Sequence, residues 1–409
     1  MSGDGRNPGP AQRSRLARTL VFLYLAPLLF GLGAKLMHSG HLFGEFETVA
    51  CAGMRALAGQ PYYSTDLTCA GQAVPAFVYL PGVAQAAGQL ISWLSLPGFT
   101  ALYGLLYGAG MVAMFAIPLF APAVPGYWRQ RLPFAALMTG GAVTWGNIAI
   151  LLHGGILTAA LIGGATSWAL VAAIVVAAWI KPVYLAYLAV IVLADATWRR
   201  KAPLLLTGLI GGLLPTVLFT ASGTPLSHQW LNLLQHFVCD VTPGVGVLGW
   251  LQALGINGRS LLAQGIWAVF AAALLGSAIL LVRDLKLNAG ERLWLGLGLA
   301  ALLIPRIMSQ DVFLIGPGLL VLASKAPKLL ATDMAGLERV LVQRGPMLLT
   351  GLCTLSLVGG LTSFSDILTP LTMLGFTVYL LMLGQIPLRR RLLRALPLRL
   401  RIATSEPAE

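Results

Sequence analysis

Residues 44–82 read GEFETVACAGMRALAGQPYYSTDLTCAGQAVPAFVYLPG and form the first long polar interruption in an otherwise apolar chain. The stretch holds carboxylates, aromatic residues and two cysteines directly after the first apolar segment. Residues 45–58 contain no helix breaker except Gly53, and Gly59 and Pro61 follow at once. Gly favours the end of a helix, and Pro prevents the helix from resuming. The pattern predicts a short surface helix in an outer loop of the protein.

The rest of the chain is too apolar for a water-soluble protein. Its 409 residues are 57% hydrophobic and only 10% charged, whereas soluble domains carry roughly 25% charged residues. Because so few charges cannot cover a chain of this length, most of the exterior must face a lipid bilayer. The apolar runs are continuous rather than alternating, which argues against a β-barrel. We therefore expect an all-α, polytopic helical membrane protein.

The formal net charge of +13 fits this class. Lys and Arg lie mostly in short segments between apolar runs and at the two ends of the chain, which is typical of the positive-inside bias. Attraction to anionic lipid headgroups or to a lipid-phosphate substrate is a second interpretation. The sequence shows no phosphate-cradling loop, kinase motif or zinc-type cysteine spacing. We expect no nucleic-acid partner, no metal and no cofactor.

The apolar runs predict a single transmembrane domain over residues 17–386 with about twelve spans. A cytoplasmic tail, 1–16, precedes it, and a basic cytoplasmic tail, 387–409, follows it. The expected spans are 17–37, 77–95, 99–120, 133–152, 155–179, 183–197, 203–222, 261–282, 291–305, 311–324, 346–363 and 367–386. The two long outer loops are 38–76 and 223–260.

One loop departs from the expected charge pattern. With the N-terminus inside, Arg129 and Arg131 fall on the outer side, where Lys and Arg are otherwise scarce. Either this loop is an exception, or the number of spans between residues 77 and 180 is wrong by one.

The first outer loop contains Cys51 and Cys69. In an oxidising compartment, a disulfide between them would stabilise the fold by roughly 3 kcal/mol, because it closes a short loop. The alternative is that they are two unrelated small residues.

Several short motifs occur in a fixed order along residues 44–325. They are Glu45-Phe46, Ala52-Gly53-Met54-Arg55-Ala56-Leu57-Ala58-Gly59, Pro61-Tyr62, Phe77-Val78-Tyr79-Leu80-Pro81, Gly146-Asn147, Ile180-Lys181-Pro182, Trp198-Arg199-Arg200, and Pro305-Arg306 followed by Asp311. In this order they resemble the polyprenyl-phosphate-dependent glycosyltransferases of the GT-C fold. The resemblance is greatest to family 87, which includes alpha-mannosyltransferases. It implies a GT-C-like helical bundle.

The resemblance also implies a reaction. A mannose-like hexose or a pentose would pass from a polyprenyl phosphate donor to a lipid-linked or envelope glycan acceptor, with inversion at the anomeric carbon. Such an enzyme would lie in the bacterial inner (plasma) membrane, with its active site on the periplasmic side. In the family, an Asp of the first outer loop is taken as the catalytic base. Alignment on Gly59 puts Glu45, which is one methylene longer, at that position, with Glu47 and Asp66 as alternatives. A partly desolvated carboxylate suits a general base.

Lys181 and Arg306 are candidates for binding the donor phosphate. Both fall at expected outer ends of spans. A cation there has a lower desolvation cost than at the bilayer centre, and it can stabilise a leaving phosphate. The alternative for each is a side chain that extends to the lipid headgroups.

The expected substrate cavity is lined by Tyr62, Tyr79, Asn147, His228 and Asp311. The tyrosines also suit an interfacial aromatic belt. Asn147 could instead make a hydrogen bond between helices, and Asp311 could form a structural ion pair with Arg306 across a short turn.

Two further histidines have structural alternatives. His153 lies in an apolar stretch and suits either a helix–helix hydrogen bond or a sugar contact. His228 shares the second outer loop with His236 and Asp240, but their spacing is poor for a metal site. They lie in either an acceptor-binding loop or a plain surface loop.

Two other functions remain open from the sequence. A transporter or lipid flippase would show interrupted helices in two related halves and charges near the bilayer midplane. We find no clear internal repeat, and the ionisable residues cluster at span ends. An assembly partner without catalysis is the third hypothesis.

Overall fold

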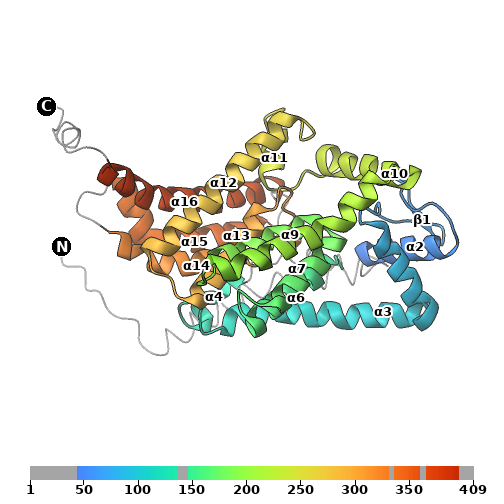
Figure 1. Ribbon diagram of the computed structural model, residues 1–409, viewed down its shortest axis with the longest axis horizontal. Helices are drawn as coiled ribbons and strands as arrows, with labels where there is room; N and C mark the ends of the chain where they lie inside the picture. Colours follow the sequence, from blue (N-terminus) through green and yellow to red (C-terminus); the bar gives the residue numbers. More distant parts are fainter. Residues whose placement is uncertain (1–43, 136–145, 331–335, 360–364, 396–409) are drawn as a thin grey trace.

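The computed structural model describes residues 44–135, 146–330, 336–359 and 365–395 (Figure 1). The described part of the chain is all-α apart from one small hairpin, as predicted. Its helices are α2 (Gly44–Leu57), α3 (Pro81–Phe120), α4 (Trp128–Ala135), α6 (Ala149–Gly163), α7 (Trp168–Ile180), η1 (Pro182–Tyr187), α8 (Leu188–Leu193), α9 (Trp198–Ala221), α10 (Pro225–Gln235), η2 (His236–Val241), α11 (Val247–Ala253), α12 (Leu261–Asp284), α13 (Ala289–Leu303), η3 (Ser309–Asp311), α14 (Ile315–Lys325), η4 (Ala326–Leu329), α15 (Gly336–Gly359) and α16 (Ser365–Ala395). Strands β1 (Thr68–Cys69) and β2 (Gln72–Ala73) pair antiparallel.

The predicted helix after residue 44 is confirmed. α2 ends at Leu57, and Gly59 adopts a left-handed conformation, with φ of +65°. The middle of α2 is buried against α3. The approach is so close that a Cβ on Gly53 would collide with the backbone of Gly88. Two glycines therefore allow α2 to lie directly on the first half of α3.

The two spans expected over 77–95 and 99–120 form one kinked helix, α3. Its break is at Ser95, where φ is +61°, and Pro97 follows. Proline lacks the amide hydrogen and clashes with the preceding turn, so the helix changes direction there. Figure 1 shows the short first half of α3 leaving the α2 region and the long second half running along the bundle.

The single span predicted over 155–179 is wrong. α6 ends at Gly163, Gly164 has φ of +81°, and the Ser167 hydroxyl accepts a hydrogen bond from the Leu170 amide at the start of α7. The sequence remains apolar across this turn, so a hydropathy average does not reveal the break. Gly163, Gly164 and the Ser167 cap produce it. Part of the span expected over 133–152 lies outside the described residues, as do the whole of 1–43 and the last residues of the chain.

The merging of two expected spans into α3 accounts for the exception in the charge pattern, because it removes one predicted crossing before Arg129 and Arg131. Arg131 donates to the carbonyl oxygens of Leu119 and Ala121 at the end of α3, at 2.9 and 2.6 Å. Ala123 packs against Gly290 at the start of α13. Arg129 and Arg131 therefore lie at the end of the bundle that also holds the basic connections around residues 195–201, 283–292 and 325–330. We name this the basic end. α2 and α10 lie at the opposite end (Figure 1). The two arginines therefore share an end with the other basic connections, which favours the alternative that the number of spans between residues 77 and 180 is wrong by one.

Four helices among the described residues are long and apolar enough to cross a membrane: Pro81–Phe120, Trp198–Ala221, Leu261–Asp284 and Ile367–Leu392. Shorter apolar helices, Ala149–Gly163, Trp168–Ile180 and Pro182–Leu193, lie among them. A helix of about 20 residues is needed to cross a bilayer, so these short helices do not confirm the expected twelve spans. The composition and these helices indicate a membrane protein.

Helix α16 extends into the segment expected to be the C-terminal tail, which begins at residue 387. It continues through Pro387 to Ala395. Arg389 pairs with Glu338 at 3.0 Å, and Arg391 pairs with Asp284 at 2.6 Å. These ion pairs fasten the end of α16 to α15 and α12, so the arginines belong to the helical bundle.

Candidate active site

Glu45, Asn147 and Lys181 form a continuous polar chain at the end of the bundle opposite the basic end. The Asn147 side-chain amide donates to Oε2 of Glu45. Its oxygen accepts from Lys181 Nζ at 3.1 Å and from the Ala149 amide at 2.8 Å. Because the oxygen is held by two donors, the NH2 group must face the carboxylate. Three residues that are far apart in the sequence thus meet in one site.

Tyr79 joins the two charged ends of this chain. Its hydroxyl donates to Oε2 of Glu45 at 3.4 Å, and its ring lies 5.2 Å from Lys181 Nζ in a cation–π contact. Burial first, and the nearby Glu45 charge second, raise the pKa of Tyr79 well above its ordinary value. The hydroxyl therefore stays protonated and remains a donor. The Tyr63 hydroxyl donates a hydrogen bond to the Tyr79 carbonyl at 2.8 Å.

The backbone before α6 presents Asn147 to the site. Gly146 has φ of +65°, a conformation that favours glycine. Its carbonyl accepts a 2.6 Å hydrogen bond from Tyr103 of α3. Asn147 is only 2% exposed, so its amide is fixed by buried contacts rather than by water.

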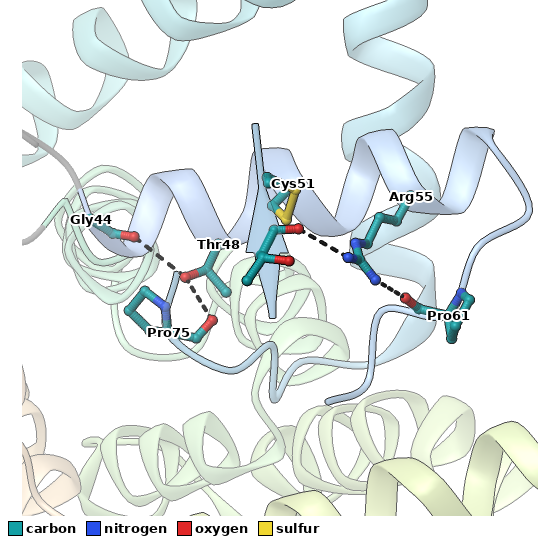
Figure 2. Close-up of a disulfide and its surroundings, with 8 residues drawn as sticks. Gly44, Thr48, Cys51, Arg55, Pro61 and Pro75 are labelled. Carbon is teal, nitrogen blue, oxygen red and sulfur yellow. Dashed lines mark hydrogen bonds between the residues drawn. A yellow bond between two sulfur atoms is a disulfide. The ribbon is translucent and has the colours of Figure 1, made fainter. Parts of the chain in front are cut away.

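Figure 2 shows how α2 is tied to the loop that follows it. Thr48 donates to the Pro75 carbonyl at 3.1 Å, and Cys51 is joined to Cys69 by a disulfide with a Cα–Cα distance of 5.8 Å. Arg55 donates to the carbonyls of Pro61 and Thr68 at 2.8 and 3.0 Å. These ties along α2 hold the loop against the helix that carries Glu45, and they support the disulfide interpretation of the sequence.

Removing the disulfide will destabilise the protein. We expect the double variant Cys51→Ser, Cys69→Ser to lose about 3 kcal/mol of unfolding free energy, because the unfolded chain gains loop entropy. Thermal unfolding in detergent, with and without reductant, measures the loss, and Cys239→Ser, which removes a free thiol, is the matched control. Reductant should shift the wild type but not the double variant. Four reactive thiols in the denatured, unreduced wild type would contradict the disulfide.

Arg306 and Asp311 lie in the connection between α13 and α14, and they do not form the ion pair expected from the sequence. Arg306 donates from Nε to the Thr242 carbonyl at 2.5 Å and from Nη2 to the Thr242 hydroxyl. Asp311 accepts from Nε2 of His153 at 2.9 Å and from the Met308 amide at 2.9 Å. The partner of the Asp311 carboxylate is therefore the buried His153 of α6.

His153 has the structural role that its apolar neighbourhood suggested. Its Nδ1 is 2.6 Å from the Tyr187 hydroxyl, and its ring also packs on Tyr184. Burial acts to raise the pKa of Asp311, but the hydrogen bond and charge of His153, with the Lys181 charge, hold it below its ordinary value. Asp311 is therefore a carboxylate, and His153 joins α6, η1 and η3 around it.

Two cations in this region lack a carboxylate at ion-pair distance among the described residues. Lys181 contacts the neutral Asn147 amide and the Tyr79 ring, and the Arg306 guanidinium donates, within the described part of the chain, to oxygen atoms of Thr242. Both interact electrostatically with Glu45 and Asp311, and with each other. Burial lowers the pKa of Arg306, opposed mainly by Asp311. Desolvated cations without direct counterions favour binding of an anion.

An apolar groove of about 490 Å³ leads away from these charges. Its lining includes Leu80, Ile148 and Ile180, each the sequence neighbour of a site residue, together with Val49 of α2 and Phe99 of α3. One end of the groove therefore adjoins the polar chain, and its walls are contributed by α2, α3, α6, α7 and α9. The combination of an anion site and an apolar groove suits an amphiphilic ligand with an anionic head.

The other predicted site residues lie elsewhere. Tyr62 packs in an aromatic cluster with Tyr63 and Phe77, and His228 is exposed on α10. Asp66 is exposed in the loop. In the described part of the chain, Tyr62, His228 and Asp66 make no hydrogen bond, ion pair or ring contact with Glu45, Asn147 or Lys181. Glu47 is half-buried on α2, two residues after the glutamate that contacts Asn147.

Sequence reasoning missed three residues that hold the site together: Tyr103, Tyr187 and Thr242. The tyrosines carried a signal, because a hydroxyl within an apolar run needs a hydrogen-bond partner. Thr242 precedes Pro243 and Gly244, a pattern that indicates only a turn.

No group of three or more His, Cys, Asp or Glu side chains in the described residues is placed to hold a metal ion. Comparisons of the chain with protein-family models, with curated proteins and with solved structures found no match.

Proposed function

We propose that the protein is an integral-membrane glycosyltransferase that uses a polyprenyl phosphate sugar as donor. The observation that carries the proposal is a pair of cations, Lys181 and Arg306, that have no direct counterion among the described residues and lie beside a carboxylate at the end of an apolar groove. A polyprenyl phosphate sugar has the matching parts. Its phosphate suits the cations, its isoprenoid chain suits the groove, and its anomeric carbon would lie near Glu45.

In the proposed reaction, Glu45 takes the proton of an acceptor hydroxyl while that oxygen forms a bond to the anomeric carbon. The bond from that carbon to the phosphate oxygen breaks, and its electron pair leaves with the polyprenyl phosphate. Attack opposite the leaving group inverts the anomeric centre. Lys181 and Arg306 stabilise the charge that develops on the phosphate. Asn147 and Tyr79 hold the carboxylate in place.

The sugar is expected to be a mannose-like hexose or a pentose, and the acceptor a lipid-linked or envelope glycan. Both expectations come from the resemblance to family 87, as does the bacterial inner membrane with the site on its periplasmic side. The test is transfer by purified protein in lipid vesicles. Transfer of label from a polyprenyl phosphate sugar to an added glycolipid, with release of polyprenyl phosphate, supports the proposal. Absence of transfer from every polyprenyl phosphate sugar supplied would contradict it.

A lipid flippase is the second candidate, because α6, α7 and η1 are short helices interrupted beside Asn147 and Lys181. Interrupted helices of this kind form ligand sites in transporters. The same vesicles distinguish the two functions. Movement of the polyprenyl phosphate sugar between leaflets without any transfer would favour the flippase.

Blocking the groove should weaken long-chain donors selectively. Ala86 lines the groove and is exposed, so Ala86→Trp fills space without disturbing the core. Each buried CH2 contributes about 0.8 kcal/mol, so excluding two or three of them raises the donor KM roughly 10- to 50-fold. A donor with a single isoprene unit should be unaffected.

Ala101→Trp is the control for this change, because Ala101 is exposed on the same helix but does not line the groove. Equal effects of the two variants, or of Ala86→Trp on long and short donors, would contradict a role of the groove in binding the isoprenoid chain.

A further inference from the structure

The second outer loop, residues 223–260, reaches the candidate site at two points. Trp230 of α10 donates through Nε1 to the Val78 carbonyl at 3.1 Å, next to Tyr79. Further along the loop, Thr242 contacts Arg306 through its carbonyl and its hydroxyl. The loop therefore bridges the Tyr79 side of the site and the Arg306 side.

The segment after Thr242 is docked on the Arg306 connection by its backbone. The Val245 amide donates to the Ile307 carbonyl at 2.8 Å, and the Leu248 amide donates to the Pro305 carbonyl at 3.4 Å. Gly244 has φ of +79°, and a Cβ there would collide with the Ile307 carbonyl. These contacts fix the position of Thr242 relative to Arg306 without any charge on the loop segment itself.

The Thr242 hydroxyl acts both as a hydrogen-bond donor and as an acceptor. It donates to the carbonyl of Phe237, a residue of the π-helical turn η2, at 3.2 Å, and it accepts from Arg306. The Thr242 amide also donates to Phe237, at 2.9 Å. Because the hydroxyl hydrogen points to Phe237, a lone pair is directed at the guanidinium.

Thr242 occupies one edge of the guanidinium, and the other edge has no hydrogen-bond partner among the residues that the structure describes. Nε and one N–H of Nη2 point to Thr242. The edge formed by Nη1 and the remaining N–H of Nη2 has the fork geometry that binds two phosphate oxygens at once. Lys181 also interacts with Arg306 electrostatically, so both cations act in the same region.

We infer that Thr242 is a positioning residue for donor binding, which holds Arg306 so that its free edge faces the phosphate of the polyprenyl donor. This inference rests on the proposed function for the identity of the ligand. It makes the second outer loop a determinant of donor affinity, although no charged residue of that loop contacts Arg306 among the described residues.

Thr242→Val tests the inference, because valine keeps the shape of threonine and removes only the hydroxyl. We expect a donor KM about 10-fold higher, because one hydrogen bond to a charged group is lost, with kcat changed less than twofold. Thr242→Ser keeps the hydroxyl and should restore the KM. Thr350→Val is the matched control, since the Thr350 hydroxyl donates within its own helix, α15, to the Pro346 carbonyl.

A double variant separates positioning from a general structural effect. In the Arg306→Met background, Thr242→Val should have no further effect on the KM, since the group that it positions is gone. Additive losses, failure of Thr242→Ser to restore the KM, or a wild-type KM in Thr242→Val would each overturn the inference.

Affinity for polyprenyl phosphate, measured without turnover, distinguishes this inference from the proposed function. If the wild type binds polyprenyl phosphate but transfers no sugar, the transferase proposal fails, and the affinities of the Thr242 variants still decide the inference. An approximately 10-fold weaker affinity in Thr242→Val, restored in Thr242→Ser, would sustain it. No affinity of the wild type for polyprenyl phosphate would overturn both.

Discussion

Glu45→Gln will reduce sugar transfer by roughly a hundred- to ten-thousand-fold, the contribution expected of a general base. Glutamine has the same shape, and its side-chain oxygen can still accept the hydrogen bonds from Asn147 and Tyr79 that Glu45 accepts. Folding and polyprenyl phosphate affinity should therefore remain close to those of the wild type. Only the capacity to take a proton is lost.

Glu47→Gln is the matched control for this experiment. It makes the same Glu-to-Gln substitution two residues further along α2, and most of the transfer activity should remain. If Glu47→Gln abolishes transfer and Glu45→Gln does not, the base is Glu47. Full activity of Glu45→Gln in purified protein would remove Glu45 from the mechanism.

Loss of either unpaired cation is expected to have the second large effect. Lys181→Met and Arg306→Met should each weaken binding of polyprenyl phosphate roughly 10- to 100-fold, because a hydrogen bond between charged groups contributes about 1.5–3 kcal/mol. Arg306→Lys should recover part of the loss, since lysine keeps the charge but not the planar fork. Affinity is measured by titration of the purified variants with polyprenyl phosphate in detergent.

Arg259→Met is the control for these cation variants. Arg259 belongs to the second outer loop but pairs with Asp240 on the exposed surface, so its loss should leave the affinity unchanged. If Arg259→Met weakens binding as much as Arg306→Met, the effect reflects the general positive charge of this end of the protein rather than a phosphate site.

The fold was predictable where hydropathy and helix-ending residues agree. Gly59 and Pro61 correctly end the helix after residue 44, and the long apolar run at 261–282 is recovered in α12. Prediction failed where hydropathy continues through a turn, as at Gly163 and Gly164 between α6 and α7. A window average cannot detect a break whose cause is one left-handed residue.

The site was predictable in its polar members but not in their contacts. Glu45, Asn147 and Lys181 were selected from short motifs, and the structure brings them together. The partner of Asp311 was not predictable, because His153 approaches from a helix that is distant in the sequence. Thr242 was missed for the same reason, since its role comes from a hydrogen bond to the guanidinium of Arg306, 64 positions further along the chain.

The most direct test of the account is a structure of the Glu45→Gln variant with a bound polyprenyl phosphate sugar. We expect the phosphate to contact both Lys181 and Arg306 and the isoprenoid chain to lie in the groove beside Ile148. We also expect the anomeric carbon to lie between the phosphate and the side chain at position 45. A phosphate bound away from both cations, or a sugar that cannot reach position 45, would contradict it.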